Sequence, residues 1–560
     1  MKRYFIDNGL LILLIFVIFI GITVSIMAVF QLSLTQDEDD RLSSGLSYWT
    51  HHEVRMYHEH SPFSKLLATS PVFLWFSLGQ IHFDEQAYIS DKLDDTYKFT
   101  NHFRDKNDFL KMTKISRLSS ILAYLFVVLM IFKISNRLFK KEAAYYSSIL
   151  SAISPTILAY SSVFAHDIFY CLAWLIFIYY TYLWIVDRSL KRVIILGLAT
   201  GFLCLNHFSC IVFPLVLFLA LIGDNFFNKR VNSFQRTIFR NDKKQLLYSV
   251  LLILIITFVV TWSGYFFQTG TILSYSKGKM EKSQYVYTII QEPKLAAKMV
   301  KYINKTNLPM PSFFLGVVNS IHKSTLKNND YFCLVRSFCS KLSALEIICF
   351  MLGMFMLIKM HKKCSYRGFF LLSILFFMVI LIISNPQTSG IKYGIVIVAL
   401  LFIAAGFGIS EISLKYRKTI FTIAVIYQLG LLLFWHPNYL SFVNELFFLK
   451  PIYKIGIKGP DLNWGQGNLM LIKKITYRFQ NKKVAVFSAD QIPIDEYRKY
   501  YPQSKIWDNL FVTKNMNVVD SISSDIIAIE SDLMDKVKSF GHLQEIDHVS
   551  NVYFIYKRVK

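Results

Sequence analysis

The chain has 560 residues, of which 54% are hydrophobic and only 18% are charged, and its formal net charge is +24. A soluble protein of this length could not bury so much apolar surface, so the composition excludes an ordinary water-soluble enzyme and favours an integral membrane protein. The lysines and arginines lie mainly in short loops between apolar runs, which indicates anionic lipid headgroups, and not nucleic acid, as their neighbours.

Apolar runs long enough to span a bilayer recur along residues 1–435. The first run follows a basic flank and is too long for a cleavable signal peptide, so we expect a retained anchor with the N-terminus in the cytoplasm. About eleven spans are predicted in all, at 9–31, 114–135, 143–163, 167–187, 193–207, 208–223, 246–267, 342–360, 368–384, 391–410 and 418–435.

The charges of the connecting loops test this count. The loops that it places on the inner side are all basic, as the positive-inside rule requires, and they are 136–142, 187–192, 228–244, 359–367 and 415–418. Merging 193–207 with 208–223 would invert the loops that follow, so the charges favour two spans there. The main outer loops are then 32–113 and 268–341, where the acidic residues concentrate.

The tail from 436 to 560 is polar, and its stretches 482–489, 524–531 and 552–559 have the length and pattern of short strands. We therefore expect an all-α transmembrane domain over 1–435 and a small α/β domain over 436–560 on the outer face.

Cys333 and Cys339 fall in an outer loop, where an oxidising compartment would allow them to form a disulfide.

The first outer loop carries the densest set of reactive side chains. Four acids, Asp37 to Asp40, follow the first span directly, and His60 and Lys65 precede the return to the membrane. A run of acids is often only a solvated, capped helix start. A loop that leaves the membrane on carboxylates and returns on His and Lys can also build a two-sided site, with a general base facing cations that bind an anionic group.

Two further features have a plain structural alternative. Asp167 begins a span on the outer side, where it is either a site residue, a helix cap or both. The histidines around His51 and His60 match no known spacing of metal ligands, so no metal ligand is predicted; a divalent metal is compatible with the loop but not indicated, and no other cofactor is expected.

The loop resembles the first outer loop of the GT-C glycosyltransferases that use a phospholipid-carried sugar, relatives of the protein O-mannosyltransferases and the lipid A aminoarabinose transferases. The family pattern is Asp-Glu, a helix with Gly-Leu-Ser-Tyr, then Glu-His-Pro-Pro-Leu and a Lys. Here Asp37-Glu38, residues 45–48 and residues 59–63 with Lys65 occupy those places. Similar segments at 137–167, 197–215, 390–398, 436–446 and 460–469 extend the resemblance to about residue 480.

The sequence also departs from the family pattern. Ser61 stands where a second Pro is usual, Arg41 where a His is common, His207 for a Lys and Lys392 for an Arg. The usual Asp-Trp-Gly-Gln-Asp has become Asn-Trp-Gly-Gln-Gly at 463–467, which puts any role of that motif in doubt.

The resemblance implies an inverting glycosyltransferase that moves a sugar from a polyprenyl-phosphate carrier to an acceptor hydroxyl at the outer face. Asp37 would be the general base by motif position, with Glu38 as its nearest rival. The phosphate would meet the cations Arg41, His60, Lys65 and Lys392. The expected partners are the lipid-linked donor, a lipid, glycan or protein acceptor, and the bilayer, which is expected to be the inner membrane of a bacterium.

Two other functions fit the same sequence. A transporter or flippase of a lipid-linked saccharide would usually carry ionisable residues near the membrane midplane, whereas here the acids gather in the outer loops. A catalytically degenerate membrane scaffold is the third reading, with which the lost acids at 463–467 are compatible.

Overall fold

The computed structural model describes most of the chain. The described residues are 2–35, 37–57, 60–76, 80–92, 94–208, 243–274, 292–325, 333–359, 370–372, 374–376, 379, 390–447, 462–479, 482–488, 494–499, 505–513, 524–531, 533–534 and 543–558.

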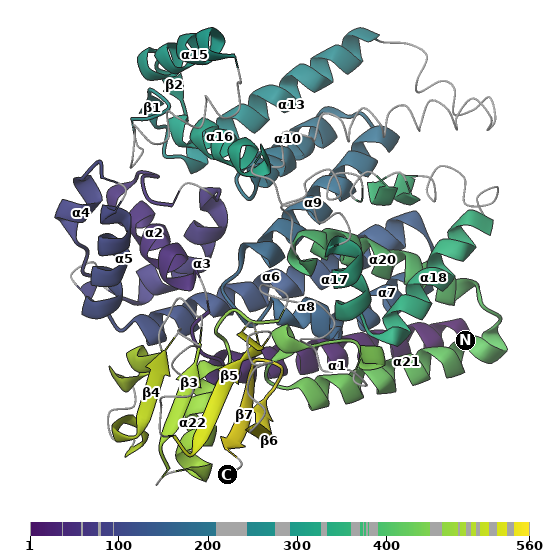
Figure 1. Ribbon diagram of the computed structural model, residues 1–560. Coiled ribbons are helices and arrows are strands. Elements are labelled where there is room, and N and C mark those ends of the chain that lie inside the picture. The colour runs from purple at the N-terminus through teal and green to yellow at the C-terminus, as the bar shows by residue number, and fades with distance from the viewer. Residues whose placement is uncertain are drawn as a thin grey trace.

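The described part of 2–447 is helical apart from two short strands that pair antiparallel, β1 (Thr269–Gly270) and β2 (Leu308–Pro309). Figure 1 shows the long helices running across the molecule as a bundle. The helices are α1 (Lys2–Gln31), α2 (Glu38–His51), α3 (Pro62–Trp75), α4 (Glu85–Ile89), α5 (Asp95–Lys106), α6 (Phe109–Leu138), α7 (Lys141–Ala152), α8 (Pro155–Ala159), α9 (His166–Val186), α10 (Leu190–Cys204), α13 (Lys243–Gly264), α15 (Pro293–Lys305), α16 (Pro311–Thr325), α17 (Cys333–Lys341), α18 (Ala344–Lys359), α20 (Ile391–Glu411) and α21 (Leu414–Trp435), followed by the 3-10 turns η3 (Tyr439–Ser441) and η4 (Glu445–Phe447).

Six described helices are long and apolar enough to cross a membrane, and α17 with α18, bent by 118°, makes a seventh if the pair is one span. The six are Asn8–Gln31, α6, α9, Lys244–Gly264, α20 and α21. They match six of the predicted spans. The total of eleven stays a prediction, because 209–223 and much of 368–384 lie outside the described residues. Cys339 in α17 is a free cysteine, and the side chain of Cys333, its suggested disulfide partner, lies outside the described part of the chain.

The predicted span 143–163 is not one helix, which corrects the sequence analysis. It is divided into α7 and the short α8, with Ser154 in an extended conformation between them. Pro155 explains the break, because proline lacks an N–H donor and disfavours a helical conformation at the residue before it. Every residue from Ala143 to Ala152 is buried, so the broken segment lies inside the bundle.

Helices α10 and α13 run parallel. Gly197 lies against Ile256, Gly201 against Val260 and Gly264 against Leu205, so the contacts advance in the same direction along both helices. A Cβ atom at Gly201 would lie 2.6 Å from Val260, so the close approach needs glycine there. Both helices therefore end at the same face of the bundle, as two spans across 193–223 would require.

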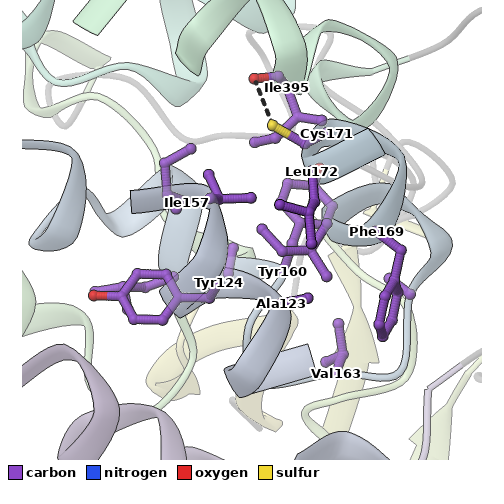
Figure 2. Close-up of a cluster of buried hydrophobic side chains, with 14 of the residues drawn as sticks. Ala123, Tyr124, Ile157, Tyr160, Val163, Phe169, Cys171, Leu172 and Ile395 are labelled. Atoms are coloured by element: carbon purple, nitrogen blue, oxygen red, sulfur yellow. Dashed lines mark hydrogen bonds between the residues drawn. The ribbon is translucent and has the colours of Figure 1, made fainter. Parts of the chain in front are cut away.

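The core of the bundle lies where α6, α8, α9 and α20 meet. Figure 2 shows side chains from all four helices in this cluster, among them Ile157, Leu172 and Ile395, with Cys171 donating to the carbonyl of Ile395 at 3.8 Å. In contrast, α1 exposes Ile12 and Phe19 by 67% and 65%. Apolar side chains that are exposed along a spanning helix face lipid, so the bundle is apolar both inside and at this surface.

The tail folds into a five-stranded mixed sheet with helix α22 (Asn468–Arg478) packed on it (Figure 1). The strand order is β4-β3-β5-β7-β6, with β3 parallel to β4 and β5 and the other pairs antiparallel. The bounds are β3 (Val484–Phe487), β4 (Leu510–Thr513), β5 (Ile526–Glu530), β6 (Leu543–Val549) and β7 (Tyr553–Arg558), with 3-10 turns η7 (Ile494–Lys499) and η8 (Lys505–Asp508). The three predicted strands correspond to β3, β5 and β7.

The tail is bonded to the C-terminal end of α1. Ser33 donates its backbone N–H to the carbonyl of Gln466 at 3.1 Å, and Leu34 donates to the hydroxyl of Tyr497 at 2.8 Å. Lys499 forms an ion pair of 2.6 Å with Asp105 at the end of α5. The sheet and the first loop therefore lie at the same face of the bundle.

Candidate active site

The first loop is built on two closely packed helices, α2 and α3. Gly45 faces α3 so closely that a Cβ atom there would lie 2.7 Å from the Thr69 side chain and 2.9 Å from the carbonyl of Lys65. Tyr48, one turn further along α2, is fully buried beneath the Lys65 ammonium, which lies 5.4 Å from the ring centroid. The Gly-Leu-Ser-Tyr segment of the sequence thus serves the contact between these helices.

Glu38 ties the loop to the bundle. It is fully buried, and its carboxylate accepts from Arg117 Nε at 2.8 Å and Nη2 at 2.6 Å. The backbone N–H groups of Thr35 and Phe164 donate to the same carboxylate at 2.7 and 2.8 Å. Because both oxygens are occupied by strong donors, Glu38 holds three chain segments together and is poorly placed to accept a proton from a substrate.

Asp37 has the opposite environment. It has a backbone φ of 66°, in the left-handed region that Asp adopts more readily than most residues. Its side chain is 44% exposed, and its carboxylate accepts from Arg41 Nη2 at 3.2 Å. Arg41 is itself buried and donates from Nη1 to the carbonyl of Phe164 at 2.8 Å. A buried, anchored cation therefore orients an open carboxylate at the end of the first membrane helix.

Asp39 and Asp40 do not have the open surroundings of a solvated acidic run. Asp39 forms an ion pair of 3.3 Å with Arg104 of α5, and Asp40 accepts from the Thr100 hydroxyl at 3.3 Å. Burial, together with the neighbouring Asp39 carboxylate, raises the pKa of Asp40 to about 7. These two acids point into the loop because α5 supplies their partners.

Lys65 is also turned inward. Its side chain is fully buried, and the ammonium donates to the carbonyl of Tyr57 and to the hydroxyl of Tyr48, the latter at 3.3 Å. We expected Lys65 to act on a lipid phosphate and not on the fold. Its surroundings instead give it a structural role, and a contact with phosphate stays a proposal.

Two other membrane helices begin beside the first loop. Asp167 lies in the first turn of α9, whose N-cap position is occupied by Ala165, and its role in the site stays a prediction. Lys392 lies in the first turn of α20, which begins after Gly390 with a φ of 95° that favours glycine. His166, next to Asp167, hydrogen-bonds to Ser64 of α3, and Arg41 donates to the carbonyl of Phe164 just before α9. The start of α9 therefore lies against the loop that carries Asp37 and Arg41.

Aromatic rings hold Lys392 in place. Its Nζ lies 5.1 Å from the centroid of Tyr393 and 5.4 Å from that of Trp464. Trp464 belongs to the altered segment 463–467, where Gln466 accepts from the Trp464 N–H at 2.6 Å and donates to the carbonyl of Leu462 at 2.8 Å. The segment is therefore a hydrogen-bonded support for Lys392, although its usual acids are missing.

A pair of neighbouring histidines, with ring planes tilted by 35°, lies at the same place. The exposed ring of His60 lies 4.6 Å from that of His166, which hydrogen-bonds through Nδ1 to the Ser64 hydroxyl. Sequence reasoning missed His166, although it directly precedes Asp167. Sequence reasoning also gave Arg117 no structural role, although the segment that contains it resembles the family pattern. Among the described residues there is no group of three or more His, Cys, Asp or Glu arranged to hold a metal ion.

A cavity of about 600 Å³ lies elsewhere in the first loop. It opens between the ends of α3 and α5 and the start of α6, and it is lined by Trp75, Phe76, Gln80, His82, Lys106, Asn107, Asp108, Lys111 and Met112. None of the predicted site residues lines it. The candidate site is consequently defined by its converging side chains and not by this cavity.

The chain is similar to one known protein family. Residues 111–262 match the model of the dolichyl-phosphate-mannose-protein mannosyltransferases. The matched stretch contains Arg117 and Asp167 but neither the first loop nor Lys392. It confirms, over these residues, the resemblance to glycosyltransferases that was drawn from the sequence. No curated protein matches the chain.

Solved membrane glycosyltransferases are distantly similar in structure. The apo oligosaccharyltransferase of Archaeoglobus fulgidus has 14% identity and a TM-score of 0.46, over 88% of this chain and 60% of that one. The oligosaccharyltransferase AglB of the same organism, with an inhibitory peptide and a dolichol-phosphate, has 12% identity and a TM-score of 0.46, over 93% and 70%. ArnT of Cupriavidus metallidurans, bound to undecaprenyl phosphate, has 10% identity and a TM-score of 0.31, over 97% of both chains. The chain thus spans less than two thirds of the first of these proteins.

Proposed function

We propose that the protein is an inverting glycosyltransferase that uses a sugar carried on polyprenyl phosphate. The observation that carries the proposal is the half-exposed Asp37 carboxylate, which lies a few residues beyond the end of α1 and accepts from the anchored Arg41. A base and cations at the level of the membrane surface suit a reaction between a lipid-borne sugar and a water-facing acceptor. The family match over residues 111–262 supports the reaction class.

In the proposed reaction Asp37 accepts the proton of the acceptor hydroxyl while the oxygen attacks the anomeric carbon. The bond between that carbon and the phosphate oxygen breaks, and the polyprenyl phosphate leaves with the electron pair. One displacement inverts the anomeric centre. Charge grows on the leaving phosphate, where preorganised cations are most effective.

The cations have different places in this proposal. Arg41, His60 and Lys392 meet the phosphate, and Asp167 keeps Lys392 and Arg41 oriented. Lys65 supports the site through Tyr48 and Tyr57, with any phosphate contact secondary, and Glu38 holds the loop to the bundle. We therefore assign Asp37 and not Glu38 as the base, because the Glu38 oxygens already accept four hydrogen bonds.

A transfer assay tests the function directly. Purified protein in lipid nanodiscs is incubated with synthetic polyprenyl-phosphate sugars and a panel of lipid, glycan and peptide acceptors. The proposal predicts release of polyprenyl phosphate together with a glycosylated acceptor whose anomeric configuration, read by NMR, is opposite to that of the donor. Retention of configuration would contradict the single displacement, and movement of the intact donor between leaflets without transfer would favour a flippase.

We further propose that the site and the domain over 436–560 lie outside the cytoplasm. The basic inner loops support this orientation. The test uses a cysteine-replaced background that still folds, with single cysteines at the exposed positions Gln86, Lys482 and Lys418. A membrane-impermeant thiol reagent should label the first two in intact cells and the third only after lysis. Labelling in the reverse order would contradict the orientation.

A further inference from the structure

Helix α15 carries an exposed surface that the proposed reaction does not use. Leu295, Met299 and Tyr302 are exposed by 50%, 38% and 56%. The sequence of the helix, PKLAAKMVKYINK, contains no acid and carries four exposed lysines, at 294, 298, 301 and 305. A helix that is both apolar and basic on its outside has two possible attractions to a membrane surface.

The side chains of α15 form separate stripes. At about 100° per residue, positions 295, 299 and 302 share one side of the helix, and the four lysines share the next. Ala296 is fully buried and Val300 packs against the Ile272–Leu273–Leu315 cluster, so these two face the protein. Ala297 lies on the side opposite the apolar stripe. The apolar stripe therefore lies between the protein-facing side and the basic side. This arrangement suits a helix that lies flat on a membrane surface beside the protein, with its lysines directed away from the protein.

The position of α15 relative to the membrane follows from its attachment to α13. The carbonyl of Gln268, just before β1, accepts from Trp262 Nε1 in the last turn of α13 at 2.9 Å. It also accepts from the N–H of Met310, just after β2, at 2.8 Å, so the last turn of α13 is bonded to the β1–β2 pair. Leu308 of β2 pairs with Gly270, and only two residues separate it from the end of α15. Three residue steps cover at most about 10 Å, so α15 ends near the membrane end of α13. Figure 1 shows α15 beside β1 and β2 at this end.

The end of α13 has the character of a membrane interface. Its outward side chains Ile255 and Val259 are exposed by 59% and 48%, as expected for contact with lipid. The aromatic residues Trp262, Phe266 and Phe267 follow at its end, where aromatic side chains mark the boundary between lipid and water. Leu205, at the end of α10, lies against Gly264 at the end of α13. Its carbonyl accepts from the N–H of Phe63 in the first loop. Helix α15 therefore lies at the face of the membrane that carries the candidate site.

We propose that α15 is a surface helix that binds anionic phospholipid headgroups, with Leu295, Met299 and Tyr302 inserted between the lipids and the lysines paired with their phosphates. Charge complementarity and the position at the membrane end of α13 select this partner. The helix would hold the rim of the second outer loop to the bilayer. The proposal stands whether or not the chain transfers sugars.

The experiment uses the full chain in nanodiscs of phosphatidylcholine alone or with added phosphatidylglycerol. An environment-sensitive fluorophore is attached through an azide-bearing amino acid at Met299 or, as a matched control, at Ala297. The expected result is a blue-shifted emission at position 299 that shallow spin-labelled lipids quench. Both effects should be stronger with phosphatidylglycerol and weaker in high salt. Position 297 should stay water-exposed in both membranes.

A charge-removal variant separates the two attractions. Lys294, Lys298, Lys301 and Lys305 are changed to Gln, and a control variant has the exposed Lys92, Lys482, Lys483 and Lys557 changed to Gln. The first variant should lose the dependence on phosphatidylglycerol, whereas the control should keep it. Equal water exposure at 299 and 297 in both membranes would overturn the proposal. Shielding of 299 only after a soluble anionic polymer is added would also overturn it and would indicate an acceptor-binding surface instead.

Discussion

Glu38 and Arg117 form an ion pair in which both side chains are buried, with Arg117 Nη2 2.6 Å from a Glu38 oxygen. Arg117 also donates to the carbonyl of Ser33, so the pair joins α6, the end of α1 and the start of α2. One residue earlier, Asp37 stays half exposed, with the Arg41 guanidinium beside it. The adjacent acids of the loop therefore have different tasks, and variants can separate them.

Glu38→Gln should destabilise the fold. The substitution removes one charge of a buried pair and leaves the Arg117 guanidinium without its counter-charge, which typically costs about 3–5 kcal/mol. The midpoint of thermal unfolding in detergent should fall clearly for Glu38→Gln and change little for Asp37→Asn. A fully stable Glu38→Gln protein that has lost only transfer activity would return Glu38 to the position of catalytic base.

Lys65 and Lys392 should behave differently. Lys65→Ala leaves the carbonyl of Tyr57 without its buried donor, a loss of about 1–3 kcal/mol, so the unfolding midpoint should fall. Lys392→Ala should keep the midpoint and raise the concentration of lipid donor needed for half-maximal rate. Unchanged donor use in the folded Lys392→Ala protein would remove Lys392 from the phosphate site.

The stability of the protein should fall as the pH rises from about 4 to about 7. Burial raises the pKa of Asp40 to about 7, whereas an unfolded Asp titrates near 3.9. The folded state therefore holds more protons across this window, and the contribution of protonated Asp40 is lost as the pH passes through the folded pKa. Unfolding midpoints measured from pH 5 to 8 should decline, and Asp40→Asn should flatten the decline. An identical slope in wild type and Asp40→Asn would contradict this assignment.

Gly45→Ala should destabilise the first loop by about 1–3 kcal/mol, because the new methyl group would meet the Thr69 side chain and the Lys65 backbone. Gly430→Ala in α21 is the matched control, since nothing lies within 4 Å of the Cβ position there. Unfolding midpoints of the two variants provide the comparison. A Gly45→Ala midpoint no lower than that of Gly430→Ala would mean that α2 and α3 are not as tightly packed as described.

Sequence patterns predicted the long single helices and the buried strands because each has a local signal. The apolar run of α9 and the short apolar segment of β5 need no partner to be recognised. The break in 143–163 also has a local cause in Pro155, but the apolar run on both sides of it concealed the break. Local signals thus explain most of the fold.

The candidate site was harder to predict, because burial depends on contacts between distant segments. The sequence shows four consecutive acids, but only Arg117 and Phe164, far along the chain, distinguish Glu38 from Asp37. The partners of Asp39 and Asp40 come from α5, and Lys65 points inward because Tyr48 and Tyr57 enclose it. The motif provided the candidate residues, whereas the tertiary contacts determine the surroundings of each one.

The most direct test of the central claim is single-turnover sugar transfer by Asp37→Asn. The variant keeps the size of the side chain and removes its basic oxygen, and Asp40→Asn serves as the control within the same acidic run. Loss of a general base typically lowers the rate about 10²–10⁴-fold. We predict such a loss for Asp37→Asn, with an unchanged unfolding midpoint and intact donor binding, and a much smaller loss for Asp40→Asn. Wild-type transfer by a folded Asp37→Asn protein would contradict the account.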